Sequence, residues 1–73
     1  MKLGWERGEH NKSILYAVML HDNGVATPTG LREEHLKPVQ AWCEGNNCGV
    51  RLAFDMFSFK TEEDMTTFLL RWS

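Results

Sequence analysis

The most constraining feature of the chain is a change of hydrophobic spacing near its carboxyl end. Up to Phe59 the large apolar residues recur at the short spacing of a strand that is packed on at least one face. Beyond Thr61 the spacing becomes i, i+3, i+4 and i+7, which places Met65, Phe68, Leu69 and Trp72 on one stripe of a helix. The sequence therefore predicts a strand that leads directly into an amphipathic helix.

Thr61 is well placed to cap this helix, because its hydroxyl oxygen can accept a hydrogen bond from a backbone N–H of the first turn. Asp64, three residues later, can complete an exchange like that of a capping box. Glu62 and Glu63 add negative charge at the positive end of the helix dipole, and Arg71 complements the other end. We expect the helix to begin just after Thr61.

Residues 13–21 predict a central strand, because apolar residues occupy both of its alternating sides. One side carries Leu15, Ala17 and Met19, and the other carries Ile14, Tyr16, Val18 and Leu20. Such a strand is covered on both faces by its own chain, or by the helices on one face and by a partner on the other.

The segments that flank this strand predict short additional elements. Asn23-Gly24 is the favoured pair for a type I′ turn, so a hairpin into residues 25–27 is expected, and Pro28 stops the return strand early. Residues 1–12 are polar apart from Leu3 and Trp5, and they form either a flexible arm or a short edge strand.

Residues 31–45 have helical spacing, and Thr29 or Gly30 can cap the helix that they form. Pro38 predicts a kink, or a short first turn followed by a second helix that starts at Pro38. Residues 45–47, Gly-Asn-Asn, tolerate left-handed backbone angles and predict the end of the helix.

Residues 48–60 predict a second long strand, in which the apolar residues change sides near Asp55. A β-bulge or burial on both faces would explain that change. The whole chain, 1–73, therefore predicts one small α+β domain with the order strand, helix, strand, helix. We expect a two- to four-stranded mixed or antiparallel sheet with both helices on one face. Its exposed edges make a homodimer by edge pairing one way to complete the fold.

Composition excludes several classes of function. Eight basic and ten acidic residues give a net charge of −2, which disfavours a nucleic-acid binder that relies on phosphate contacts. No segment approaches the roughly 20 apolar residues that cross a bilayer, and the first ten residues lack the apolar core of a signal peptide. We expect a cytoplasmic protein with no membrane association, in which both cysteines are thiols.

Two groups of residues are candidates for a metal site or a catalytic site. Cys43 and Cys48 could bind zinc together with two of His10, His21 and His35, form a disulfide, or pack as small apolar groups. The carboxylates next to the histidines point away from them at i+1 spacing, and neither a nucleophile motif nor a Gly-rich phosphate loop is present. We expect no enzymatic activity, no metal and no cofactor.

The aromatic residues of the second long strand give an alternative function. Single-strand RNA binders stack bases on strand aromatics, and Phe54, Phe57 and Phe59 have a similar arrangement. The basic residues that flank them are Arg51 and Lys60. The alternative hypothesis is therefore a regulator associated with nucleic acid.

The end of the chain, FSFKTEEDMTTFLLRW, resembles that of short, mostly uncharacterised accessory proteins encoded by tailed bacteriophages. In those proteins an aromatic strand leads into a helix that starts with acidic residues. The matching residues are Phe57, Phe59, Glu62, Glu63, Asp64, Phe68, Leu70, Arg71 and Trp72. The resemblance covers the last quarter of the chain and implies a phage or mobile-element protein that acts by binding a host or phage protein.

These observations predict a small binding protein that docks on another protein and inhibits or modulates it. Tryptophan and arginine dominate the energetically important positions of protein interfaces. We therefore expect Trp5 and Trp42 to contact the partner, with Arg51 and Arg71 as polar anchors.

Overall fold

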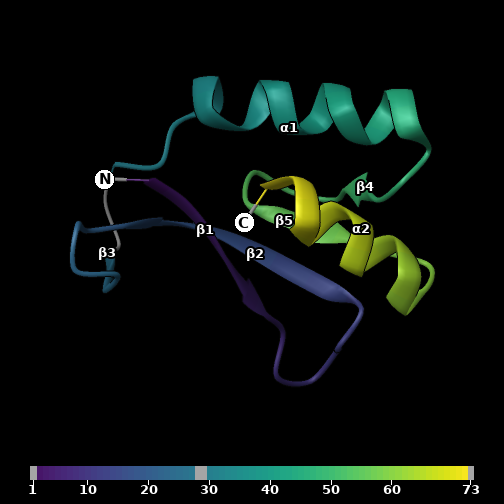
Figure 1. Ribbon diagram of the computed structural model, residues 1–73, viewed down its shortest axis with the longest axis horizontal. Helices are drawn as coiled ribbons and strands as arrows, with labels where there is room; N and C mark the ends of the chain where they lie inside the picture. Colours follow the sequence, from purple (N-terminus) through teal and green to yellow (C-terminus); the bar gives the residue numbers. More distant parts are fainter. Residues whose placement is uncertain (1, 28–29, 73) are drawn as a thin grey trace.

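In a computed structural model, the chain forms an antiparallel sheet with two helices on one face (Figure 1). The structure describes residues 2–27 and 30–72. The elements in chain order are β1 (Lys2–Arg7), β2 (Ile14–Leu20), β3 (Ala26–Thr27), α1 (Glu33–Asn46), β4 (Val50–Arg51), β5 (Met56–Ser58) and α2 (Glu62–Trp72). The predicted α+β class is confirmed, and the sheet is antiparallel. The predicted count of two to four strands is wrong, because five strands pair within the described residues.

The sheet is built around β2, which pairs along both of its edges. The strand order is β1-β2-β5-β4, and every pair is antiparallel. β1 pairs with the full length of β2, whereas β5 and β3 divide the opposite edge between them. β1 and β4 are the two ends of this strand order, and β3 also pairs along one edge only.

The long strand expected at residues 48–60 is a hairpin instead. β4 and β5 are joined by a turn in which the Leu52 N–H donates to the Met56 carbonyl (2.8 Å). The carbonyl of Asp55 accepts a hydrogen bond from the Ala17 N–H of β2 (2.8 Å). The apolar residues therefore change sides because the chain reverses, and the expected β-bulge is wrong.

The hairpin from β2 into β3 is present, but its turn is not of type I′. That type needs a positive φ at both central residues, whereas Gly24 (φ 83°) is the residue of this loop with a positive φ. The Gly24 N–H donates to the His21 carbonyl (2.8 Å), and the His21 N–H donates to the Val25 carbonyl (2.8 Å). This pattern is that of a three-residue loop in which Gly24 takes the left-handed position. Near the amino end, residues 2–7 form the edge strand β1.

α1 is a single helix that contains Pro38, so the alternative in which a second helix starts at Pro38 is wrong. Pro38 lies early in the helix, and Glu34, whose carbonyl loses its usual donor, is exposed to solvent. Thr29, expected as a cap, lies outside the described residues. As expected, a left-handed residue, Asn47 (φ 50°), ends the helix. Neither α1 nor α2 combines the length and the apolar character that crossing a bilayer requires.

The core lies between the helices and one face of the sheet, with Phe68 of α2 at its centre. Its ring packs edge-on against Trp5 of β1 (centroids 4.8 Å apart) and Phe59 (4.9 Å), and it also contacts Trp42 of α1 and Phe57 of β5. The buried core residues are Leu15, Ala17, Leu36, Val39, Cys43, Cys48, Phe57, Phe59, Met65 and Phe68. The predicted helix stripe is confirmed, because Met65 and Phe68 are buried and Leu69 and Trp72 pack against this core.

The prediction that Thr61 caps α2 is also confirmed. The Asp64 N–H donates to the Thr61 hydroxyl oxygen at 3.1 Å, and the Met65 N–H donates to the Thr61 carbonyl at 3.2 Å. Near the start of α2, Glu62 forms an ion pair with Arg7 at the end of β1. This ion pair therefore joins the end of β1 to the start of α2.

Replacing Phe68 by alanine is expected to destabilise the fold by about 3–5 kcal/mol, since a fully buried ring that contacts four other rings is lost. Leu70 is 83% exposed on the same helix, and its alanine variant should change stability by less than about 0.5 kcal/mol. Urea denaturation monitored by tryptophan fluorescence measures both. Equal losses of stability in the two variants would contradict the central position of Phe68. A Phe68→Leu variant should lose less stability than Phe68→Ala and more than Leu70→Ala.

Candidate functional site

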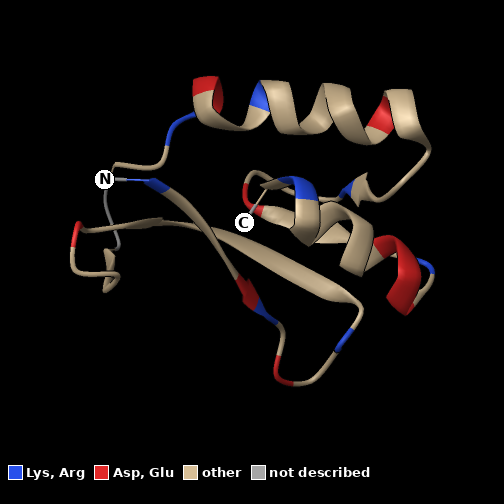
Figure 2. Cartoon of the chain, viewed as in Figure 1, with Lys and Arg blue, Asp and Glu red and all other residues tan. Residues whose placement is uncertain are grey.

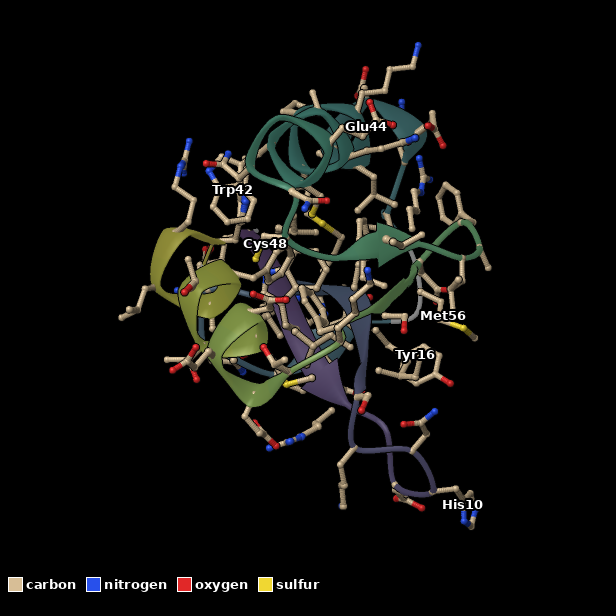
Figure 3. The ribbon with its side chains drawn as sticks, turned by 90° about the vertical axis from the view of Figure 1, so that its right-hand side faces the viewer. His10, Tyr16, Trp42, Glu44, Cys48 and Met56 are labelled. Atoms are coloured by element: carbon tan, nitrogen blue, oxygen red, sulfur yellow. The ribbon has the colours of Figure 1, made fainter. Side chains whose placement is uncertain are left out.

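The two faces of the sheet differ in what covers them. Leu15, Ala17 and Met19 of β2 point into the core, so the residues that alternate with them point to the other side. Figure 3 shows Tyr16 and Met56 on the side of the sheet away from both helices, whereas Cys48 lies on the helix side. We call the side without helices the open face.

An apolar patch covers much of the open face. It consists of Tyr16, Val18 and Leu20 of β2, Met56 of β5, Val50 of β4, and Leu52 next to β4. Tyr16 pairs across strands with Met56, whose carbonyl accepts the Leu52 N–H, so the three side chains form one row. Val50 and Leu52 are each 56% exposed. An antiparallel sheet with one solvated face normally places polar residues there, and this face departs from that pattern.

Charge is nearly absent from the open face. Figure 2 shows β2 without a charged residue, while charges are common on the helices. By register, Lys2 lies opposite Leu20 and Glu6 lies opposite Tyr16. Among the charged residues of the described strands, these two residues of β1 are the ones that lie on the open face. Between them is Gly4, where an added Cβ would lie 2.6 Å from Leu20 Cδ1. Leu20 therefore covers the backbone of β1 at Gly4.

Three of the predicted partner contacts lie together on the helix side of the molecule. Trp5 donates its indole N–H to the Trp72 carbonyl (3.3 Å), and Trp42 packs edge-on against Trp72 (6.4 Å between centroids). The guanidinium of Arg71 stacks over the Trp72 ring at 4.2 Å. Trp5 and Trp42 pack against the core, whereas Arg71 is exposed, and the contact of all three with a partner stays a prediction.

Arg51, the fourth predicted contact, binds within the chain. Its guanidinium forms two hydrogen bonds of 2.7 Å with the carboxylate of Glu33, and it also donates to Gln40 Oε1 (3.0 Å) and to the Phe54 carbonyl (2.7 Å). The Arg51 side chain is only 11% exposed. It therefore ties α1 to the hairpin of β4 and β5, and its donors are already used.

This ion pair also affects ionisation. The hydrogen bond from Arg51 holds the pKa of the Glu33 carboxyl below its ordinary value of 4.5, and the hydrogen bond to Glu33 raises the pKa of Arg51. Because the pKa of Glu33 is lower in the folded state, the pair stabilises the fold fully above pH 4.5. That stabilisation is lost as the pH falls through the folded-state pKa.

The Glu33→Gln variant is expected to have a lower melting temperature than the wild type at neutral pH, with the difference shrinking on acidification to about pH 3. Glu34→Gln is the matched control, because it removes the same charge from the neighbouring residue of α1. Circular-dichroism melts across this pH range measure the effect. A difference that does not depend on pH would contradict a contribution from the ionised pair.

Both cysteines are free thiols buried in the core. Burial, reinforced by the nearby Cys48, raises the pKa of the Cys43 thiol to about 11. Burial and the carboxylate of Asp64 raise the pKa of Cys48, whose thiol donates to the Asp64 carbonyl at 3.1 Å. Within residues 2–27 and 30–72, no group of three or more His, Cys, Asp or Glu side chains is placed to hold a metal ion.

Both thiols are expected to react at least about tenfold more slowly with a thiol reagent in the folded protein than in guanidinium, because the thiolate is the reactive form and little of it is present near pH 8. Absorbance of the released chromophore measures the rate, and a Cys48→Ser variant assigns it. Rapid reaction of one thiol in the native protein would show that it is accessible and ionised.

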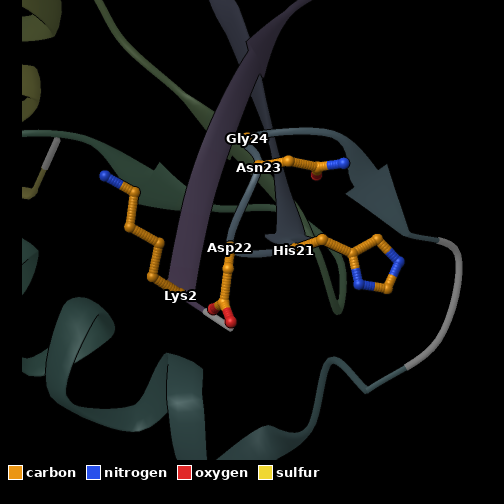
Figure 4. Close-up of a pocket in the computed structure, with 5 residues that line it drawn as sticks. All are labelled: Lys2, His21, Asp22, Asn23 and Gly24. Carbon is orange, nitrogen blue, oxygen red and sulfur yellow. The ribbon is translucent and has the colours of Figure 1, made fainter.

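A hollow lies elsewhere, at the turn after β2. It has a volume of about 460 Å³ and is lined by Lys2, His21, Asp22, Asn23 and Gly24. In Figure 4 the Lys2, His21 and Asp22 side chains point in different directions and do not converge on a common point. The described residues of this lining include no serine, threonine or cysteine that could act as a nucleophile.

The aromatic platform expected for base stacking is not formed. Phe57 and Phe59 are buried, with 0% and 3% of their surface exposed, so bases cannot stack on them. Of the three phenylalanines, Phe54 is exposed (47%). Burial therefore contradicts the stacking hypothesis for two of the three rings that it named.

No protein-family model matches the sequence, and no curated protein and no solved structure matches it either. The apolar patch of the open face is the structural feature that bears on function. Sequence reasoning did not name its residues as a binding site. The signal that could have found them is the apolar character of both sides of β2.

Proposed function

We propose that this protein is a non-enzymatic binding protein that docks on another protein through the apolar patch and inhibits or modulates it. The observation that carries the proposal is that six apolar residues, of which Val50 and Leu52 are exposed and the other four half-buried, share the sheet face opposite the helices. Contiguous exposed apolar surface marks interaction sites, whereas single exposed apolar residues are ordinary.

The chemistry of the patch favours a protein partner with an apolar surface. Tyr16 and Met56 sit in the middle row, and tyrosine and methionine are enriched at the centres of protein interfaces. A nucleic-acid strand would require cations beside the aromatic residues, and the strands that carry the patch, β2, β4 and β5, contribute no cation to this face.

The source and setting of the protein are also part of the proposal. The carboxyl-terminal resemblance, carried by residues such as Phe68 and Trp72, supports an origin in a tailed bacteriophage. The partner would then be a host or phage protein in the host cytoplasm. We further propose that two copies associate through a free edge of the sheet.

Replacing Leu52 by glutamate is expected to reduce partner capture at least tenfold, because a charge would be buried against an apolar surface. Leu70→Glu is the matched control, since Leu70 is an exposed leucine on α2, on the helix side. Tagged wild type and both variants are incubated with nuclease-treated lysates of bacteria before and after phage infection, and bound proteins are quantified by mass spectrometry.

The proposal requires a protein that the wild type and Leu70→Glu retain and that Leu52→Glu loses. Circular dichroism verifies that both variants are folded. Equal retention by Leu52→Glu, or capture that returns only when nuclease is omitted, would contradict docking through the patch.

A further inference from the structure

The free edge of β1 has a regular set of unpaired backbone groups. The Gly8 N–H donates to the Ile14 carbonyl (2.9 Å), which fixes the alternation along β1. Because of this alternation, the backbone groups of Lys2, Gly4 and Glu6 face β2, and those of Leu3, Trp5 and Arg7 point away from the sheet. Among the described residues, these outward groups have no backbone hydrogen-bond partner. An unprotected edge of this kind pairs readily with another strand.

The side chains of β1 add opposite charges to this edge. Lys2 and Glu6 are exposed and lie on the same face, about 14 Å apart along the strand, so they cannot pair with each other. Neither side chain has an ion-pair or hydrogen-bond partner in the described part of the chain. A hollow of about 210 Å³, lined by residues 2–5 and Leu20, lies beside them, and β1 is at the end of the strand order of the described sheet.

We propose that two copies of the protein pair antiparallel through β1, with Gly4 on the two-fold axis. Lys2 then lies directly opposite Glu6 of the second copy, twice in the dimer, at a separation typical of a cross-strand ion pair. On the other face, Leu3 lies opposite Trp5 of the second copy. The outward backbone groups of residues 3 and 5 meet as hydrogen-bonded pairs.

The charges select this register over its neighbours. With the axis at Trp5, Glu6 would face Gly4 and Leu3 would face Arg7, so no opposite charges meet directly. With the axis at Glu6, the two carboxylates would face each other, which is unfavourable. The axis at Gly4 is therefore the register in which both charges of each strand are matched.

The consequence for binding rests on the proposed function. Antiparallel pairing about an axis perpendicular to the sheet keeps both open faces on the same side. At the seam Gly4 has no side chain and Leu20 lies over it, so the two apolar patches approach each other without a charged barrier at the axis. The dimer therefore presents one two-fold symmetric docking surface, to which each copy contributes half.

Reversing the charge of Lys2 or of Glu6 tests the proposed pairing of the two β1 strands. The wild type should dimerise in sedimentation velocity at low ionic strength, and Lys2→Glu and Glu6→Lys should each weaken the dimer by about tenfold or more, because each creates two like-charge pairs. An equimolar mixture of the two variants should restore dimers, since every pair is again opposite in charge. Lys37→Glu and Glu44→Lys make the same charge changes on the exposed side of α1 and should leave the dimer unchanged.

A wild type that stays monomeric up to about 1 mM, a dimer that tolerates both single changes, or a mixture that does not recover would each overturn the pairing. The capture experiment with Leu52→Glu gives a separate answer, because Leu52 lies beside β4 on the opposite edge of the sheet. Loss of capture in that variant with a monomeric wild type would overturn the dimer and leave the docking function standing.

Discussion

The structure depends on the burial of Phe68 against four other aromatic rings. This contact joins α2 to β1 through Trp5, to α1 through Trp42, and to β5 through Phe57. A chain of this length buries only a limited apolar surface, so a few large rings must supply much of its cohesion. Both helices are therefore held on one face of the sheet, where those rings are, and neither helix is available to cover the other face.

Sequence spacing was most reliable where one physical signal dominated. The stripe from Met65 to Trp72 and the cap at Thr61 were predictable because helix periodicity and capping are local. The hairpin of β4 and β5 was not, because the apolar residues from Leu52 to Phe59 conceal a turn without glycine or proline. The turn is held by contacts distant in sequence, from Arg51 to Glu33 and from Ala17 to Asp55.

The candidate site, too, could be predicted only where the signal was local in the sequence. Because tryptophan and arginine are common at important interface positions, the sequence predicted Trp5 and Arg51 as partner contacts. In the structure Arg51 binds Glu33, and Trp5 donates to the Trp72 carbonyl. The apolar alternation of β2 was visible in the sequence, and it left open whether chain or partner covers the second face. That choice depends on where α1 and α2 pack, which periodicity does not specify. Residues such as Leu52 joined the patch only once the register was known.

The ion pair of Arg51 and Glu33 has a mechanical consequence. Arg51 lies between Val50 and Leu52 in the sequence. Two residues of the apolar patch therefore flank the residue whose side chain binds Glu33 of α1. Glu33 and Gln40, which accept the hydrogen bonds of Arg51, lie in the first turns of α1. One strand residue therefore fixes the position of the outer edge of the open face relative to the start of α1.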